Sequence, residues 1–160
     1  MYSKIMLTLD GSDLSRQALP HAVGVAKATG AEMIVAQVID SETQMLSQAS
    51  GVTIEPLPAG RVNAEIAREA VQAQRAAAQE NLEDAKAVIE GEGVTSVSTA
   101  VLEGEPGYAI VEAVAEMDVD LVVMATRGRS GFKRAVLGSI ADHIVRNTPS
   151  AAVLLVRPEE

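Results

Sequence analysis

The sequence predicts an α/β fold with an open, parallel, five-stranded sheet and helices on both of its faces. Short apolar runs of strand length alternate along the chain with segments of helical spacing. Strands separated by helices imply parallel pairing and right-handed crossovers. The chain has 160 residues, the size of one ordinary domain, and neither a repeat nor a linker divides it. We therefore expect a single domain over residues 1–160.

The first quarter of the chain is predicted as strand, helix and strand. Lys4–Asp10 is a short apolar run, and Ala31–Asp40 is a second. Between them, apolar residues recur at helical spacing, with Ser12 suited to the N-cap and Gly30 to the C-terminal stop. Pro20 lies inside this helix. Because proline removes a backbone hydrogen bond, we expect a kink there.

Residues 41–61 show no clear period, and we expect a long loop. Connections of this length are unusual in a compact domain and often form lids or binding loops, although a surface insertion is the plainer interpretation. A long helix should follow and end at the glycines of residues 90–93. Eight residues at helical spacing are expected to form its apolar face: Val62, Ile66, Ala70, Ala73, Ala77, Leu82, Ala85 and Ile89.

The second half of the chain continues the alternation. Val94–Gly104 alternates as a strand does, and Pro106 suits the first turn of the next helix. Val119–Ala125 is almost wholly apolar, as expected for a strand that is covered on both faces. After a glycine-rich, basic stretch and one more helix, Ala151–Arg157 closes the chain as the fifth strand.

The composition excludes several classes of site and partner. The net charge is −9, so we expect no nucleic acid partner and no anionic membrane partner. No apolar run approaches the roughly 20 residues that cross a bilayer. The chain lacks cysteine, which excludes disulfides and thiolate metal sites. No signal-peptide pattern is present at the N-terminus, and we expect a cytoplasmic protein.

Positive charge gathers once, in the stretch before the last helix. Four of the thirteen basic residues lie there among glycines, at Arg127, Arg129, Lys133 and Arg134. Solvated charges that aid solubility are one interpretation. The other is electrostatic attraction of a small anion, which the adjacent helix start favours.

The last helix is expected to begin at Gly138–Ser139 and to run through about Val145. Ser139 and Asp142 have the spacing of a capping box. Free N–H groups and the positive end of the helix dipole make such a start a natural phosphate site. The Ser139 hydroxyl is therefore expected to cap the helix, to bind phosphate, or to do both.

The carboxyl ends of parallel strands form the expected ligand site of an open sheet. Asp10 follows the first strand, Val38–Asp40 ends the second, and the glycine-rich basic stretch follows the fourth. Asp118 and Asp120 flank the start of the fourth strand, at the opposite edge, so we discount them as metal ligands. Ser139, Asp142 and His143 do not suggest a catalytic relay, because adjacent helix positions point in different directions.

The basic stretch resembles the nucleotide loop of the universal stress protein family, of the ATP-binding type. That family carries G-x-x-G, nine residues and G-[ST]; here the corresponding positions are Ala125, Gly128 and Gly138–Ser139. The D-G-S after the first strand, the V-I-D of the second, E-G-E-P and the final P-S-A-A-V-L-L-V-R-P resemble the family as well. Two positions depart from it: Thr8 stands where ATP-binding members often have proline, and Ala125 replaces a glycine.

The resemblance implies a Rossmann-like sheet of the adenine nucleotide alpha hydrolase-like kind, with strand order 3-2-1-4-5. It implies ATP, with Mg²⁺ on the phosphates, across the ends of the first and fourth strands. It also implies a homodimer through Ala151–Val156. Carried over by position, the residues at the nucleotide are Thr8, Leu9 and Asp10 by the adenosine, Val38 by the adenine, Ala125 and Gly128 under the ribose and phosphates, Gly138, Ser139 and Ile140 at the phosphate, and Arg127 and Arg129 within reach of it.

The function that the sequence favours is an ATP-binding module for nucleotide-dependent stress response or signalling. Two alternatives stay open. A dimeric stress or interaction protein that binds no nucleotide is favoured by Ala125, whose methyl group is tolerable only if its backbone is extended rather than at positive φ. A slow ATP hydrolase is the second, but the sequence offers no evident general base and no catalytic residue is predicted.

Overall fold

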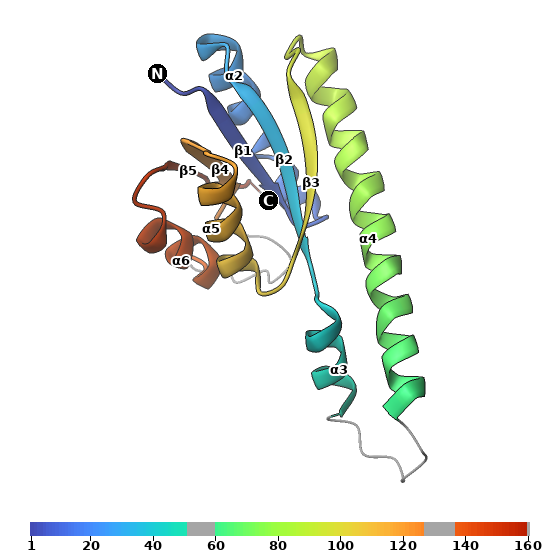
Figure 1. Cartoon of the computed structure of the whole chain (residues 1–160). Helices are drawn as coiled ribbons and strands as arrows, with labels where there is room; N and C mark the ends of the chain where they lie inside the picture. The colour runs from blue at the N-terminus through green and yellow to red at the C-terminus, as the bar shows by residue number, and fades with distance from the viewer. Residues whose placement is uncertain (51–59, 127–136, 160) are drawn as a thin grey trace.

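Parallel strands form one sheet in the computed structural model, which describes residues 1–50, 60–126 and 137–159. All four neighbouring pairs in this sheet are parallel. Their order is β3-β2-β1-β4-β5, which confirms the expected order (Figure 1). The strands are β1 Lys4–Leu9, β2 Glu32–Ile39, β3 Val97–Glu103, β4 Leu121–Ala125 and β5 Ala152–Val156.

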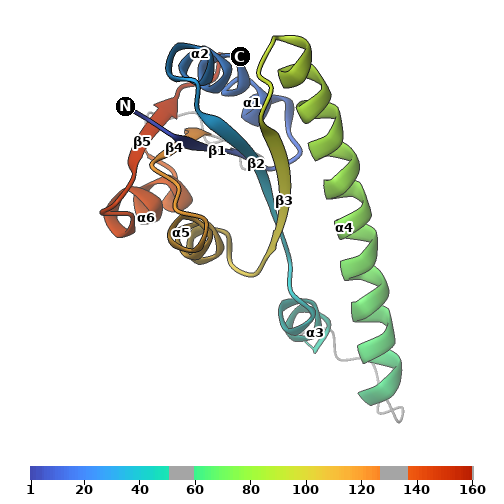
Figure 2. The same ribbon diagram turned by 45° about the horizontal axis from the view of Figure 1, so that its top comes forward.

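Helices cover both faces of the sheet (Figure 2). The described helices are α1 Asp13–Arg16, α2 Leu19–Thr29, α3 Glu42–Ser50, α4 Gly60–Gly91, α5 Pro106–Glu116 and α6 Ser139–Asn147. Successive side chains of β1 point to opposite faces. Ile5 and Leu7 pack in a core cluster with residues of α2 and α4, whereas Met6 packs with residues of α5 and α6.

The expected first helix is present as two helices, α1 and α2. The side chain of Ser12 caps α1 by accepting from the backbone N–H of Ser15, and Gly30 ends α2 with a left-handed φ of 72°. Pro20 lies in the first turn of α2. A proline ring clashes with the carbonyl four residues earlier, which here belongs to Arg16, the last residue of α1. The predicted kink is therefore a full break.

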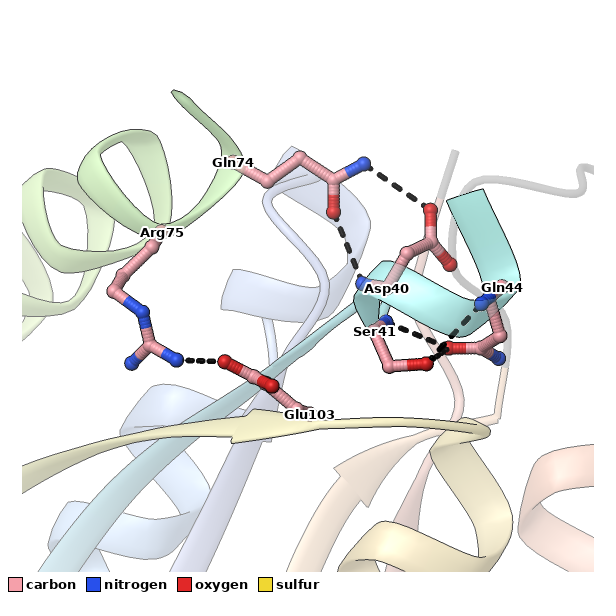
Figure 3. Close-up of polar contacts among 6 residues, drawn as sticks. All are labelled: Asp40, Ser41, Gln44, Gln74, Arg75 and Glu103. Carbon is pink, nitrogen blue, oxygen red and sulfur yellow. Dashed lines mark hydrogen bonds and ion pairs between the residues drawn. The ribbon is translucent and has the colours of Figure 1, made fainter. Parts of the chain in front are cut away.

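The prediction of a loop over residues 41–61 is wrong for its first part, because Glu42–Ser50 forms α3. The backbone N–H of Gln44 donates to Oγ of Ser41 at 3.3 Å, and the N–H of Ser41 donates to Oε1 of Gln44 at 2.8 Å (Figure 3). This is a capping box, in which each side chain satisfies a backbone donor of the other residue. Residues 51–59 lie outside the described part of the chain.

The predicted apolar face of α4 is correct in one half of the helix and wrong in the other. Leu82, Ala85 and Ile89 are completely buried, as expected. Upstream, Ile66 is 58% exposed, and Ala73 and Ala77 are exposed as well. Ala70 is intermediate, and the side chain of Val62 is not among those described. The buried residues in this half are Ala67, Val71 and Ala78.

The physical reason is that two adjacent stripes of this half both have helical spacing. Val71 and Ala78 are buried because they pack against Ile39, at the end of β2, and the partly buried Met45 of α3. Since α3 was not predicted, the stripe that faces it could not be predicted either. The end of α4 at Gly91 falls within the expected glycines.

Candidate functional site

Three strands bring the predicted site residues to one edge of the sheet, where the parallel strands reach their carboxyl ends; we call it the carboxyl edge. Leu9 is paired with Gln37 of the neighbouring strand, so the next residues along, Asp10 and Val38, follow side by side. On its other side β1 pairs with β4, which ends at Ala125. Thr8 and Leu9 themselves are buried, with 8% and 4% exposure.

Asp10 is held by the turn that leads into α1. Its Oδ1 accepts from the backbone N–H of Ser12 at 2.9 Å and from Oγ of Ser12 at 2.5 Å. The N–H of Asp10 donates to Oγ of Ser15 at 3.3 Å. Gly11 between them has a φ of 82°, a left-handed conformation that favours glycine. The D-G-S sequence therefore fixes the carboxylate at the end of β1.

Ala125 is an ordinary strand residue. It pairs with Val156 of β5, and the following N–H, of Thr126, donates to the carbonyl of Val156 at 2.8 Å. Among the described residues, Asp118 is the one non-glycine residue with positive φ. The expectation of an extended backbone at Ala125 is therefore confirmed, and the methyl group that replaces a motif hydrogen introduces no backbone strain.

Helix α6 begins directly beside the end of β4. Gly138 is its N-cap, with φ −60° and ψ 152°. A Cβ at Gly138 would lie 3.3 Å from the carbonyl oxygen of Thr126, so only a glycine fits here without some shift of backbone. Of the two roles expected for Ser139, capping is wrong: Ser139 is the first helical residue and exposed, and no side chain of the described residues caps α6.

The start of α6 leaves backbone donors without helical partners. The N–H of Asp142 donates to the carbonyl of Gly138 at 2.9 Å and is the first of the helical series. The preceding N–H groups, of Ser139, Ile140 and Ala141, have no acceptor in the helix. Ser139 is exposed and Ile140 is 38% exposed. Such a helix start attracts an anion through its N–H groups and its dipole.

The predicted basic residues belong to the segment between β4 and α6. Arg127, Gly128 and Arg129, with Lys133 and Arg134, lie outside the described residues. The described residues that flank this segment are Thr126, directly after β4, and Leu137, just before α6. Their contact with a ligand stays a prediction.

The other polar groups of α6 are engaged in packing and pairing. Both carboxylate oxygens of Asp142 accept from Nε of Arg146, at 3.0 and 2.9 Å. The ring of His143 lies 4.3 Å from the ring of Tyr108 in α5. Ser139, Asp142 and His143 therefore form no relay. In the described ranges, no group of three or more His, Cys, Asp or Glu side chains could hold a metal ion.

Asp120 lies at the opposite edge, as expected. Its carboxylate accepts from the backbone N–H groups of Ser3, at 2.8 Å, and Lys4, at 3.1 Å. These contacts hold the start of β1 against the start of β4, which is a structural role. In the parts of the chain that the structure describes, no helix has the length and apolar character needed to cross a membrane.

Sequence reasoning missed a set of polar contacts between α4 and the end of β2. Gln74 contacts Asp40, and Asn81 contacts Gln37 (Figure 3 shows the first pair). Arg75, next to Gln74, forms an ion pair with Glu103 at the end of β3. A signal was present, because Gln74 interrupts the buried stripe that Val71 and Ala78 define. The partners could not be read from the sequence, since they lie 34 and 44 residues away.

Comparison with known proteins gives a match along the whole described fold. The model of the universal stress protein family matches residues 1–157. Universal stress protein MJ0531 of Methanocaldococcus jannaschii is 31% identical over 160 residues, which are 100% of this chain and 85% of that protein. Universal stress protein YxiE of Bacillus subtilis is 32% identical over 158 residues, covering 98% of this chain and 100% of that protein.

Solved structures share the fold at lower identity. Hypothetical protein MJ0577 superposes with a TM-score of 0.80 at 23% identity, covering 100% of this chain and 99% of that one. The universal stress protein of Archaeoglobus fulgidus in complex with dAMP has a TM-score of 0.65 at 19% identity, covering 98% of each chain. A family member from Arabidopsis thaliana with AMP bound has a TM-score of 0.64 at 15% identity, covering 98% of this chain and 92% of that one.

Proposed function

Because this chain belongs to the universal stress protein family, we propose that it binds ATP at its carboxyl edge and acts in nucleotide-dependent stress signalling. The observation that carries the proposal is the start of α6, which no described side chain caps, beside the ends of β1 and β4. Adenine nucleotides in three structural neighbours, cAMP, dAMP and AMP, support it. That the nucleotide bound by this chain is the triphosphate, together with Mg²⁺, is our proposal.

In the proposed complex the nucleotide spans the edge from β2 to α6. Asp10 and the backbone of Val38 contact the adenosine, with Thr8 and Leu9 beneath it. The phosphates lie at the N–H groups of Gly138, Ser139 and Ile140, where the helix dipole favours negative charge. Ala125 and Gly128 pass under the ribose and phosphates, and Arg127 and Arg129 neutralise part of their charge.

We assign the signalling output to a cytoplasmic homodimer formed through Ala151–Val156. β5 is the last strand of the described sheet and pairs with β4 alone. Its sequence is AVLLV, and Ala152 at its start is exposed. An apolar edge strand is an association hazard unless it is paired or covered. Pairing of two such edges across a two-fold axis would remove the hazard in both subunits.

The direct test is the nucleotide itself. The purified protein is denatured, and released nucleotides are identified by mass spectrometry. Titration calorimetry then compares ATP, ADP, AMP and cAMP, with and without Mg²⁺. We expect ATP to bind, and saturation at one hundred times Kd to stabilise the fold by about 2.7 kcal/mol. Absence of both released nucleotide and binding would favour the alternative of a nucleotide-free interaction protein. Phosphate release from bound ATP would favour the hydrolase.

Ser139→Asp tests the placement of the phosphates. A carboxylate at the first position of a helix stabilises it by about 0.3–1 kcal/mol through the dipole. The same charge would repel a phosphate bound there. We therefore expect an unchanged or higher melting temperature together with a loss of ATP affinity of at least about tenfold, equivalent to about 1.4 kcal/mol.

Two controls make this variant interpretable. Ser139→Ala removes the hydroxyl without adding charge, and Gly24→Asp adds the same charge at an exposed position of α2, where a Cβ would meet nothing within 4 Å. Gly24→Asp should bind ATP within about threefold of the wild type, which is under 1 kcal/mol, and Ser139→Ala should lose clearly less affinity than Ser139→Asp. If Ser139→Asp binds ATP as the wild type does, the phosphates lie elsewhere. Sedimentation of the wild type tests the dimer, and a monomer at all concentrations would exclude it.

A further inference from the structure

Helix α4 contacts the end of β2 at two points, one on each side of Val38. Oε1 of Gln74 accepts from the backbone N–H of Asp40 at 3.0 Å, and its Nε2 donates to Oδ2 of Asp40 at 3.1 Å (Figure 3). Nδ2 of Asn81 donates to Oε1 of Gln37 at 2.6 Å. Gln74 and Asn81 are seven residues apart, about two helical turns, and therefore lie on the same face of α4.

Asn81 also joins β2 to the turn at the end of β1. Nη2 of Arg16 donates to Oδ1 of Asn81 at 2.6 Å. Arg16 ends α1, the short helix that Ser12 caps while donating to Asp10. One amide side chain thus connects the strand that carries Val38 with the helix that fixes Asp10.

We propose that Gln74 and Asn81 are positioning residues for the adenosine end of the nucleotide site, an inference that rests on the proposed function. Neither touches the ligand. Gln74 fixes the point where β2 leaves the sheet, and Asn81 fixes the separation between β2 and α1. A site whose two walls are held before binding loses less conformational freedom when the ligand arrives, and therefore binds more tightly.

The surroundings of these two residues argue against a role in stability alone. The stripe of α4 on which they lie is otherwise apolar, with Val71, Ala78 and Leu82 buried. Replacing both partners of such a hydrogen bond by apolar residues of similar shape can leave the free energy of unfolding unchanged or raise it. The reason is that the two amides give up hydrogen bonds to water when they bond to each other. Amides at both positions, each bonded to the same strand end, are explained by a need to hold that strand end in place.

The first experiment replaces each amide by an apolar residue of similar shape. Gln74→Met and Asn81→Leu remove the hydrogen bonds and keep good helix formers. We expect ATP binding, measured by calorimetry, to weaken about threefold to tenfold in each variant. Gln72→Met and Gln79→Met are matched controls, because both glutamines lie on the exposed side of the same helix. The controls should bind as the wild type does.

The second experiment exchanges donor and acceptor. Gln74→Glu sets a carboxylate against that of Asp40 and should weaken binding. Adding Asp40→Asn restores a donor for the new carboxylate, so the double variant should recover the wild-type affinity. A residue with a merely structural role would change the melting temperature of the unliganded protein but would not give this loss and recovery in Kd.

The outcomes separate the two proposals. A wild-type protein that binds no adenine nucleotide overturns the proposed function and this inference with it. A wild-type protein that binds ATP, with unchanged Kd in Gln74→Met, Asn81→Leu and Gln74→Glu, overturns the positioning role alone. Amide hydrogen exchange at Asp40 shows independently whether each variant has lost the contact with residue 74.

Discussion

The two halves of α4 differ in what they pack against. From Leu82 onward the helix packs on the sheet, and Leu82, Ala85 and Ile89 are completely buried. From Gly60 to Gln74 it continues past the ends of the strands, where α3 lies beside it (Figures 1 and 2). Ile66, the largest apolar side chain described in that half, is 58% exposed. One continuous helix therefore belongs to the core at one end and to a two-helix projection at the other.

This difference shows that helical periodicity identifies a helix without identifying its buried side. Apolar residues recur at helical spacing through both halves. In the half on the sheet, contact with the strands determines which side of the helix is buried. In the other half α3 determines the buried side, so Ala67 and Val71 are buried whereas Ile66 and Ala73 are exposed. The variants below measure how far the two halves differ in energy.

Leu82→Ala should have the largest effect. Leu82 is fully buried between α4 and the sheet, so its truncation loses transfer free energy and leaves a cavity. We expect a loss of about 2–5 kcal/mol in the free energy of unfolding, measured by urea denaturation. A loss below 1 kcal/mol would show that this half of α4 is no more tightly packed than the other.

Gly107→Ala extends the comparison to the helices on the opposite face. A Cβ at Gly107 would lie 2.9 Å from Cδ2 of His143, so α5 and α6 are packed too closely for alanine. Overpacking of this kind costs about 1–3 kcal/mol. In a His143→Ala background the two closest contacts, with Cδ2 and Cγ, are removed and the Cβ of residue 143 remains at 3.3 Å, so the same change should cost clearly less. An equal cost in both backgrounds would contradict this packing.

Ser41→Ala should act on the projecting part alone. It removes the side-chain cap of α3, which is worth about 0.5–2 kcal/mol. Because α3 is not part of the core on the sheet, we expect faster amide exchange in residues 42–48 with little change in the global melting temperature. A cooperative loss of stability equal to that of Leu82→Ala would show that the projection and the core unfold as one unit.

Ile66→Ala should have the smallest effect. The side chain is more than half exposed, and surface substitutions usually change stability by less than about 0.5 kcal/mol. Urea denaturation beside Leu82→Ala provides the measurement. A loss above 1 kcal/mol would mean that Ile66 is covered in solution, for example by a second copy of the chain.

Much of the fold followed from local signals. Ser12 caps the start of α1 and Gly30 ends α2, as the chemistry of serine and glycine predicts. The apolar runs form parallel strands. The loop prediction over residues 41–61 failed for its first part although Ser41 and Gln44 have capping-box spacing, because the apolar residues after them showed no clear period. The face of α4 failed because it depended on that missing helix.

The layout of the candidate site was predictable where it depends on the order of the elements along the chain and less so where it depends on packing. Asp10 lies at the carboxyl edge because it follows β1, and Val38 because it is near the end of β2. Gly138 lies there because α6 begins beside the end of β4. Ser139 was mistaken for the cap because serine is favoured there, but the N-cap is Gly138, where a Cβ would approach the carbonyl oxygen of Thr126 to 3.3 Å. The contacts of Gln74 and Asn81 depend on how α4 lies on β2, which no local pattern specifies.

The length of α4 has a mechanical consequence. Its projecting part, Gly60–Gln74, extends about 22 Å at 1.5 Å per residue. If the helix is stiff, it works as a lever whose pivot is at Gln74, beside the end of β2. A tilt of about 10° there would displace the tip by about 4 Å. Small displacements at the end of β2 would thus become larger displacements at the Gly60 end of the helix. A displacement of the Gly60 end would in turn be transmitted through Gln74 to Asp40.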